Sequence, residues 1–351
     1  MSTTTVPTTT VPMTTLPALT SAADRLLMDE ARPMLHGTIA VIDAGEIAMR
    51  VGNEVGRPRI SLDSAADSAR FNPGRVDVGL EDVVRDADVV LLRLPKSLDQ
   101  LDDIAREVAR HAKATVTLIA GGRLKYMSLS MNDVLARSFG NVRASLARQK
   151  SRVLFAAEPR AVAAPEPRNA HLDDLDLDVV AWGGVFAGAS LDIGTRAMLA
   201  TFDSLPAFER AIDFGCGTGI LAAQLKRARP AARVIASDDS EIAVRSARET
   251  FAANALDIAV AHESLLDGQA GDSVDLIVLN PPFHEGGSVS RETAQAMFVA
   301  AARKLRPGGE LRVVWNSHLG YRPALESTVG PTTQLTRTPK FTVTTSIKPT
   351  N

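Results

Sequence analysis

The sequence predicts two tandem α/β domains, each an open, mostly parallel sheet with helices on its faces. With 351 residues, the chain exceeds the ~100–200 residues usual for one domain. Short β-branched apolar runs alternate with helical stretches in both halves, the pattern of layered α/β domains. A proline-rich stretch separates the halves. Hydrophobic residues make up 45% and charged residues 23% of the chain, which is typical of a globular protein.

Composition excludes several classes of protein. No apolar run reaches the ~18–20 residues that a membrane-spanning helix needs. The single cysteine, Cys216, cannot form an intrachain disulfide, so a reducing cytoplasm is the expected compartment. The formal net charge is −2. Because the chain is not basic overall, contact with a polyanion would need a local patch of positive charge.

The first domain is expected at residues 21–158, after a disordered Thr/Pro-rich tail at residues 1–20 that cannot bury enough apolar surface to fold. Its strands are predicted from β-branched runs of four to seven residues bounded by Gly, Pro or charge. They are Thr38–Asp43, Asp88–Leu94 and Ala114–Ala120. A helix is predicted over Ser97–Lys113, where apolar residues recur at helical spacing.

A linker is expected at residues 159–175, because its prolines at 159, 165 and 167 cannot continue a helix. The second domain, residues 176–351, repeats the alternation of strands and helices. Its predicted elements are strands Glu209–Phe214, Arg233–Ser237, Val274–Leu279 and Gly309–Trp315, and helices Ile220–Arg229, Glu241–Asn254 and Arg291–Leu305. Two terminal strands, Thr332–Thr338 and Phe341–Ile347, are separated by two residues, and this tight turn predicts an antiparallel pair.

A glycine-rich loop follows the first strand of the second domain. The sequence DFGCGTG at residues 213–219 places glycines at alternate positions, where the backbone can turn sharply and approach a ligand. Asp238 follows the next strand, where this type of fold places an acid that binds a ribose. The loop lacks the G-x-G-x-x-G spacing of a dinucleotide site. A turn built for packing alone is the alternative, and we favour a nucleoside ligand.

The tetrapeptide Asn280-Pro-Pro-Phe283 follows the strand Val274–Leu279. The Asn280 side-chain oxygen and the Pro281 carbonyl can together accept hydrogen bonds from one planar NH₂ group. Phe283 can stack on the ring that bears this group. Such a loop catalyses by positioning an amine. A rigid strand end is the alternative.

These motifs resemble those of class I S-adenosylmethionine-dependent methyltransferases that act on exocyclic or amide nitrogens. Residues 183–194 (GGVFAGASLDIG) and the ending PKFTVTTSIKP further resemble the bacterial ribosomal-RNA guanine-N2 methyltransferases. The resemblance implies two Rossmann-like methyltransferase domains, the first degenerate and the second catalytic. It implies S-adenosyl-L-methionine around Asp213, Gly215, Gly217, Asp238 and Asn280, to which we add Cys216, Gly219, Asp239 and Ser264, with guanine held by Asn280, Pro281 and Phe283.

The first domain carries no such site in its sequence. Asp43-Ala-Gly45 has one glycine where the second domain has three, and Leu94-Pro-Lys96 lacks both the asparagine and the second proline. We therefore expect this domain to contact RNA without binding the cofactor. The region from Thr117 to Ala156 resembles the large-subunit (23S) enzyme more than the small-subunit (16S) enzyme.

A basic stretch without acidic residues lies between Asp133 and Glu158. Several positive charges in a row can neutralise phosphates, although such runs often serve only as solvated surface. Contact with RNA is predicted at Arg143, Arg148, Lys150 and Arg152. No metal site is predicted, because the histidines are scattered.

The sequence thus favours a cytoplasmic, monomeric enzyme that methylates N2 of a guanine in 23S ribosomal RNA, either free or in an unassembled ribosomal intermediate. Three alternatives stay open: a 16S guanine-N2 methyltransferase, a protein-glutamine N-methyltransferase with a similar Asn-Pro-Pro loop, and a non-catalytic RNA-binding assembly factor.

Overall fold

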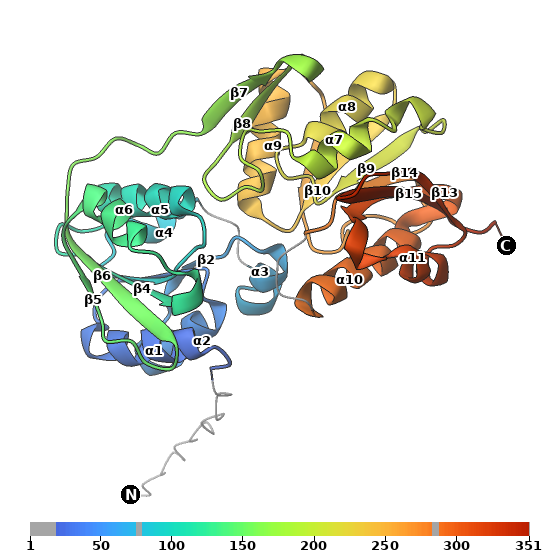
Figure 1. Cartoon of the computed structure of the whole chain (residues 1–351). Helices are drawn as coiled ribbons and strands as arrows, with labels where there is room; N and C mark the ends of the chain where they lie inside the picture. Colours follow the sequence, from blue (N-terminus) through green and yellow to red (C-terminus); the bar gives the residue numbers. More distant parts are fainter. Residues whose placement is uncertain (1–18, 75–78, 283–287, 351) are drawn as a thin grey trace, which may run out of the picture.

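The computed structural model describes residues 19–74, 79–282 and 288–350, and these form two α/β domains joined by an extended segment over residues 160–167 (Figure 1). Of the tail expected at residues 1–20, residues 1–18 lie outside the described part. No helix in the described ranges is long and apolar enough to cross a membrane.

The sheet of the first domain has the strand order β2-β1-β3-β4-β6-β5. Strands β1 to β4 are parallel, and β5 and β6 form an antiparallel hairpin at one edge. The strands are β1 (Ile39–Ile42), β2 (Arg59–Ser61), β3 (Val89–Arg93), β4 (Thr117–Arg123), β5 (Phe139–Ala144) and β6 (Ser151–Pro159). The three strands predicted here are confirmed, whereas β2 and the hairpin were not predicted.

Helices cover both faces of this sheet (Figure 1). They are α1 (Ala22–Ala31), α2 (Gly45–Glu54), α3 (Ala65–Phe71), α4 (Leu80–Val84), α5 (Leu98–His111) and α6 (Ser130–Ser138). The predicted helix is α5, which begins where the Ser97 hydroxyl accepts a hydrogen bond from the Gln100 N–H at 3.3 Å, a typical N-cap. Its apolar face, with Leu101, Ile104 and Val108, is buried.

The sheet of the second domain has the order β11-β10-β9-β12-β13-β15-β14. Its strands are β9 (Arg210–Phe214), β10 (Arg233–Asp238), β11 (Ala259–His262), β12 (Val274–Leu279), β13 (Leu305–Asn316), β14 (Thr332–Arg337) and β15 (Phe341–Ile347). Strands β9 to β13 are parallel, and β15 is antiparallel to both β13 and β14. The predicted terminal pair is therefore confirmed, and only β11 was not predicted in this sheet.

The helices of this domain are α7 (Ile193–Leu199), α8 (Ile220–Ala228), α9 (Glu241–Ala253), α10 (Ser288–Lys304) and α11 (Arg322–Thr328). A separate hairpin, β7 (Arg168–Leu172) with β8 (Leu177–Ala181), packs on α9. The Val180 and Trp182 N–H groups donate to hydroxyls of α9 at 3.0 and 3.1 Å. Because β7 falls within residues 159–175, the extended part of the predicted linker is shorter than expected and ends before Arg168.

The two sheets repeat one topology. The order β2-β1-β3-β4-β6-β5 corresponds strand by strand to β10-β9-β12-β13-β15-β14, and β11 has no counterpart among the described residues of the first domain. Strand β1 therefore corresponds to β9, and β3 to β12. Leu94, which follows β3, occupies the position that Asn280 occupies after β12.

The domains meet where helices α3 and α9 begin, and each helix is capped by the other domain. The first two N–H groups of α3 donate to the carbonyl and carboxylate of Asp239, at 2.8 and 3.0 Å. The first two N–H groups of α9 donate in the same way to Asp63, at 2.8 and 2.9 Å. The His262 Nε2 lies 3.1 and 3.0 Å from the two carbonyl oxygens. These contacts satisfy donors that a helix start leaves unpaired.

Candidate functional site

The glycine loop connects β9 to α8 and keeps its glycines in left-handed backbone conformations. The φ angles are +74° at Gly215, +54° at Gly217 and +82° at Gly219, a region that side chains disfavour. A Cβ at Gly219 would lie 2.5 Å from the Phe251 ring, whereas a Cβ at Gly217 would meet no protein atom within 4 Å. Gly219 is thus required for packing, and Gly217 leaves open space where a ligand can approach the backbone.

Asp238, the last residue of β10, holds the glycine loop in place by hydrogen bonds. Its two carboxylate oxygens accept hydrogen bonds from the N–H groups of Gly217, at 2.9 Å, and Ser240, at 3.0 Å. Burial raises the pKa of Asp238 above its ordinary value. Each oxygen keeps a second lone pair, so the carboxylate can also accept from ligand hydroxyls.

Asp213 supports the loop from behind. Its side chain is 1% exposed, and Oδ2 accepts from the Ala222 N–H in α8 at 2.9 Å. Burial raises the pKa of Asp213 to about 7. The carboxylate therefore braces the first turn of α8, and direct contact with a ligand stays a prediction.

Cys216 lies inside the loop as a buried filler. Burial raises the pKa of its thiol well above the ordinary value, so the sulfur stays protonated and is a poor nucleophile. A buried, protonated cysteine behaves as a small packing residue, and contact of Cys216 with the cofactor stays a prediction.

Asn280 follows β12 with an oriented amide. Its Nδ2 donates to Thr195 Oγ1 at 3.1 Å and to Asp192 Oδ2 at 3.3 Å. A carboxylate oxygen can only accept a hydrogen bond, so the amide atom of Asn280 that faces Asp192 must be Nδ2 and not Oδ1. The Oδ1 atom is buried and has no hydrogen-bond partner within the described part of the chain. Buried acceptors are normally paired, so this oxygen fits a donor supplied by a ligand.

Asp192 and Thr195 belong to the start of α7. The Asp192 carboxylate caps this helix by accepting from the N–H groups of Gly194 and Thr195, at 2.8 and 3.2 Å. Residues 183–194 carry part of the family resemblance, but no role was predicted for Asp192. An acidic residue just before a helix start is a recognisable N-cap signal, although its contact with Asn280, 88 residues away, is not.

The other residues predicted for this site do not all lie in the same part of the structure. Pro281 is buried, and Phe283 lies outside the described residues. Ser264 follows β11, and Asp239 directs its carboxylate to the domain junction. Because β9 to β12 are parallel, the glycine loop, Asp238, Ser264 and Asn280 all lie at or just beyond strand ends at one edge of the sheet, where α/β folds bind ligands. Cofactor contacts of Asp239 and Ser264 stay predictions.

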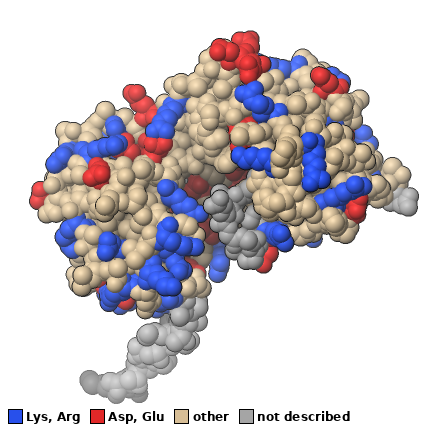
Figure 2. Space-filling view, viewed as in Figure 1, with Lys and Arg blue, Asp and Glu red and all other residues tan. Residues whose placement is uncertain are grey.

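The predicted RNA contacts lie on the hairpin β5–β6 and the loop between its strands. Arg148 pairs with Glu30 of α1 at 2.8 Å, and the Arg143 guanidinium lies 3.8 Å from the Phe155 ring centroid. The expectation of a stretch without counter-charges is therefore wrong for Arg148, because folding brings in a distant acid. Lys150 remains exposed, and Figure 2 shows Lys and Arg side chains over much of this domain.

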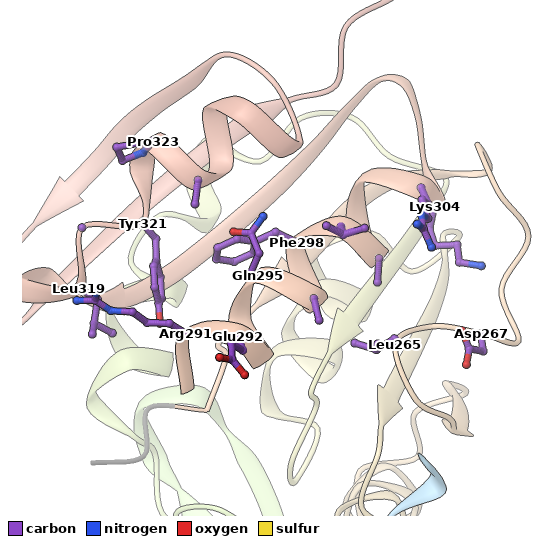
Figure 3. A pocket seen from close by; sticks show the side chains of 16 residues that line it. Leu265, Asp267, Arg291, Glu292, Gln295, Phe298, Lys304, Leu319, Tyr321 and Pro323 are labelled. Carbon is purple, nitrogen blue, oxygen red and sulfur yellow. The ribbon is translucent and has the colours of Figure 1, made fainter. Parts of the chain in front are cut away.

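A cavity of about 820 Å³ lies along α10 and α11 (Figure 3). Phe298, Gln295 and Tyr321 line it. Neither the glycine loop, Asp238 nor Asn280 contributes to its wall. Within the described ranges, no group of three or more His, Cys, Asp and Glu side chains is arranged to hold a metal ion.

Comparison with known proteins shows the family. Residues 176–345 match the methyltransferase small domain, and residues 67–160 match the RLMG N-terminal domain. The ribosomal RNA large subunit methyltransferase G of Streptomyces avermitilis is 36% identical over 337 residues, which cover 90% of this chain and 88% of that protein. The chain belongs to the ribosomal RNA large subunit methyltransferase G family. The member from Pseudomonas putida is 37% identical over 261 residues, covering 73% of this chain and 70% of that protein.

The fold of this methyltransferase G family member also matches a solved structure. The 16S rRNA N2 methyltransferase of T. thermophilus, in complex with AdoMet and guanosine, is 21% identical, with a TM-score of 0.79 over 94% of this chain and 92% of that chain. At this identity the match shows the fold alone. The resemblance and the α/β fold class predicted from the sequence are both confirmed.

Three carboxyls, one buried and two half-buried, give the protein a predictable pH dependence. Burial raises the pKa of Asp43 and Asp103 to about 6 and that of Asp213 to about 7. The folded state thus binds these protons more tightly than the unfolded state. Their cost to stability is complete above about pH 8 and is relieved as the pH falls toward the ordinary carboxyl range of about 4.

We expect Asp43→Asn to raise the free energy of unfolding at about pH 8 by ~1–3 kcal/mol. The amide retains an oxygen that can accept from the Asp63 N–H, a bond of 2.8 Å, while the buried charge is removed. The gain should fade toward pH 4. Denaturant unfolding at several pH values measures this, and identical pH dependence in variant and parent would contradict it.

Proposed function

We propose that this protein methylates the exocyclic N2 of a guanine in 23S ribosomal RNA. The observation that supports this most strongly is the buried, unpaired Oδ1 of Asn280, which lies at the sheet edge that holds the glycine loop. An unpaired acceptor at that edge suits an amino group that must be oriented for attack. Large-subunit rRNA appears in the names of the related methyltransferases. The expected setting is the cytoplasm, with a monomer acting on rRNA or an unassembled ribosomal intermediate.

As a methyltransferase of this family, the protein uses S-adenosyl-L-methionine. The residues fit this cofactor: Gly217 leaves space that a Cβ would fill, and Asp238 can accept from ribose hydroxyls. When bound, the cofactor supplies an electrophilic methyl group on a sulfonium. Gly215, Gly217, Gly219 and Asp238 would hold it.

The protein's own contribution is to orient the amine. The guanine amino nitrogen is a weak nucleophile, because its lone pair is delocalised into the ring. Hydrogen bonds from its two N–H groups to Asn280 Oδ1 and the Pro281 carbonyl would favour the pyramidal, nucleophilic form. The Asn280 amide cannot rotate freely, because Thr195 and Asp192 hold its nitrogen. The proton released after transfer can pass to solvent.

The rival functions are less well supported. A protein-glutamine methyltransferase would offer an amide NH₂ of the same geometry, but such enzymes typically carry Tyr where this chain has Phe283 and lack a degenerate α/β copy. A 16S substrate has support only from a neighbour matched at the level of fold. A non-catalytic assembly factor has no need of the open loop at Gly217.

Transfer of a labelled methyl group tests the proposed function. Purified 23S and 16S rRNA are each incubated with the protein and labelled S-adenosylmethionine, and their nucleosides are identified by mass spectrometry. We expect N2-methylguanosine from 23S rRNA only. Label in 16S rRNA, in another nucleoside or in protein glutamine would contradict the proposal.

We expect Asp238→Ala to weaken cofactor binding by ~1–3 kcal/mol, the usual cost of losing hydrogen bonds to a charged group. The loss has two parts, because Asp238 also holds Gly217 in place. Asp238→Asn keeps one acceptor oxygen and should lose less. Calorimetry with S-adenosylmethionine measures both variants, and parental affinity in Asp238→Ala would show that the carboxylate does not bind the cofactor.

Reversing two charges on the β5–β6 loop should weaken RNA binding. In the Arg148→Glu, Lys150→Glu double variant, fewer phosphates are neutralised, so affinity for rRNA should fall and depend less steeply on salt. Cofactor affinity, measured in parallel, should not change. If the variant binds RNA like the parent at every salt concentration, this loop is only a solvated surface.

A further inference from the structure

The first domain has a cavity of its own at the edge of the sheet that corresponds to the candidate site. Its volume is about 420 Å³. Leu94 and Lys96 beyond β3, Arg123 at the end of β4 and Glu46 at the start of α2 line it. The ends of the parallel strands β3 and β4 thus meet at this cavity, and they correspond to the ends of the parallel strands β12 and β13 in the second domain.

The first domain lacks the loop that would hold a cofactor. The connection from β1 to α2 comprises only residues 43 and 44, against residues 215–219 in the second domain. The Asp43 N–H donates to the Ser61 carbonyl as the Gly215 N–H donates to that of Ser237, so a carboxylate side chain replaces the first glycine of the loop.

Two further differences from the second domain leave no room or partner for a cofactor. Leu62 follows β2 at the position where Asp238 ends β10, so the acid suited to a ribose is absent. The Phe71 ring packs against Gly45, where a Cβ would lie 2.2 Å from a ring carbon. What remains open is the part beyond β3 and β4, which corresponds to the substrate side of the second domain.

The charges around this cavity leave several cations uncompensated. Arg93 pairs with the buried Asp24 at 2.5 Å, and Glu46 accepts hydrogen bonds from Thr20 at 2.9 and 3.0 Å. Asp67 is the other carboxylate in the wall. In contrast, Arg70, Lys96 and Arg123 have no carboxylate within ion-pair distance in the described part of the chain.

An exposed aromatic ring stands among these cations. Tyr126 is 45% exposed, and the ammonium groups of Lys96 and Lys125 lie 4.6 and 4.3 Å from its ring centroid. The neighbouring ammonium group of Lys125, together with the charges of Lys96 and Arg123, lowers the pKa of Tyr126. Lysine side chains are flexible, so these ammonium groups can move from the ring face of Tyr126 to bind a phosphate oxygen.

We propose that this cavity binds one unpaired nucleotide of the RNA substrate, with its base on Tyr126 and its phosphate held by Lys96 and Arg123. An aromatic ring beside free cations is the arrangement that recognises splayed-out bases in single-stranded RNA. The volume lies within the range of about 300–1,000 Å³ usual for small-molecule sites. The site adjoins the β5–β6 loop, because the Leu124 N–H donates to the Lys150 carbonyl at 3.0 Å. The inference rests on the proposed function.

The test uses full-length protein and a 23S rRNA transcript. Tyr126→Ala should weaken RNA binding about tenfold, the typical effect of losing one stacking partner, whereas Tyr126→Phe should bind like the parent. Lys96→Ala with Arg123→Ala should weaken binding and reduce its salt dependence. Arg57→Ala, which removes an exposed charge of the same domain away from the cavity, is the matched control and should change affinity much less.

Three outcomes separate the possibilities. If the parent methylates 23S rRNA but Tyr126→Ala and the double variant bind RNA like the parent, the cavity takes no nucleotide. If calorimetry finds two equivalents of S-adenosylmethionine per chain, the first domain retains a cofactor site and the inference is overturned. If the parent itself methylates no 23S rRNA, the proposed function fails instead. Cross-linking of a photoreactive transcript to residues 123–126 would support the proposal directly.

Discussion

Asn280→Ala should reduce turnover about a hundredfold or more while cofactor affinity stays near that of the parent. The Asn280 Oδ1 is proposed to accept from the attacking amine, so its loss acts mainly on the orientation reached in the transition state. Its nitrogen is already bound by Thr195 and Asp192, and truncation leaves these groups in place. Single-turnover kinetics at saturating cofactor measure the chemical step.

Thr195→Val is the matched control for this prediction. It removes the hydroxyl that receives the Asn280 amide, at 3.1 Å, without changing the size of the side chain, so it should give a smaller loss in the chemical step. If Asn280→Ala keeps near-parental turnover while cofactor affinity falls sharply, Asn280 binds only the cofactor. The proposed role of the Asn-Pro-Pro loop would then be wrong.

Gly219→Ala should destabilise the second domain severely and abolish cofactor binding. The new Cβ would lie 2.5 Å from the Phe251 ring and 3.2 Å from the Ala247 Cβ, in a backbone conformation with φ of +82°. Overpacking costs ~1–3 kcal/mol, and a side chain in the left-handed region adds ~1–2 kcal/mol. Denaturant unfolding measures the total.

Gly217→Ala separates the cost of a strained backbone from the cost of a steric clash. Its φ of +54° imposes a comparable backbone cost, but its Cβ meets no protein atom within 4 Å. We expect a stability loss of only ~1–2 kcal/mol together with a marked loss of cofactor affinity, because the methyl group enters the ligand's space. Parental cofactor affinity in Gly217→Ala would show that the cofactor does not approach the loop there.

Much of the second domain could be predicted from the sequence because its signals are local. Buried parallel strands such as Val274–Leu279 are continuous apolar runs, and the glycines at 215–219 follow one of them directly. Strands β2 and β11 were not predicted, because they lack this local signal. Strand β2 has only three residues, and neither β2 nor β11 has a fully buried residue. Such strands are specified by their neighbours in the sheet rather than by their own pattern.

The missed parts of the site depend on contacts between distant residues. Asp192 orients Asn280 across 88 residues, and Asp63 caps α9 across 179 residues. The ion pair of Arg148 was missed for the same reason, because Glu30 lies 118 residues away in the sequence. No local pattern encodes these pairings, whereas the residue types that take part, a helix N-cap acid and a strand-end asparagine, are visible in the sequence.

The most direct test of the central claim is a crystal structure of the protein with S-adenosylhomocysteine and guanosine. We predict that the guanosine N2 lies about 3 Å from Asn280 Oδ1, within hydrogen-bond distance, with the nucleoside of the cofactor product at Gly217 and Asp238. A structure in which Asn280 Oδ1 binds the cofactor product, or stays unpaired while guanosine occupies another surface, would contradict the account.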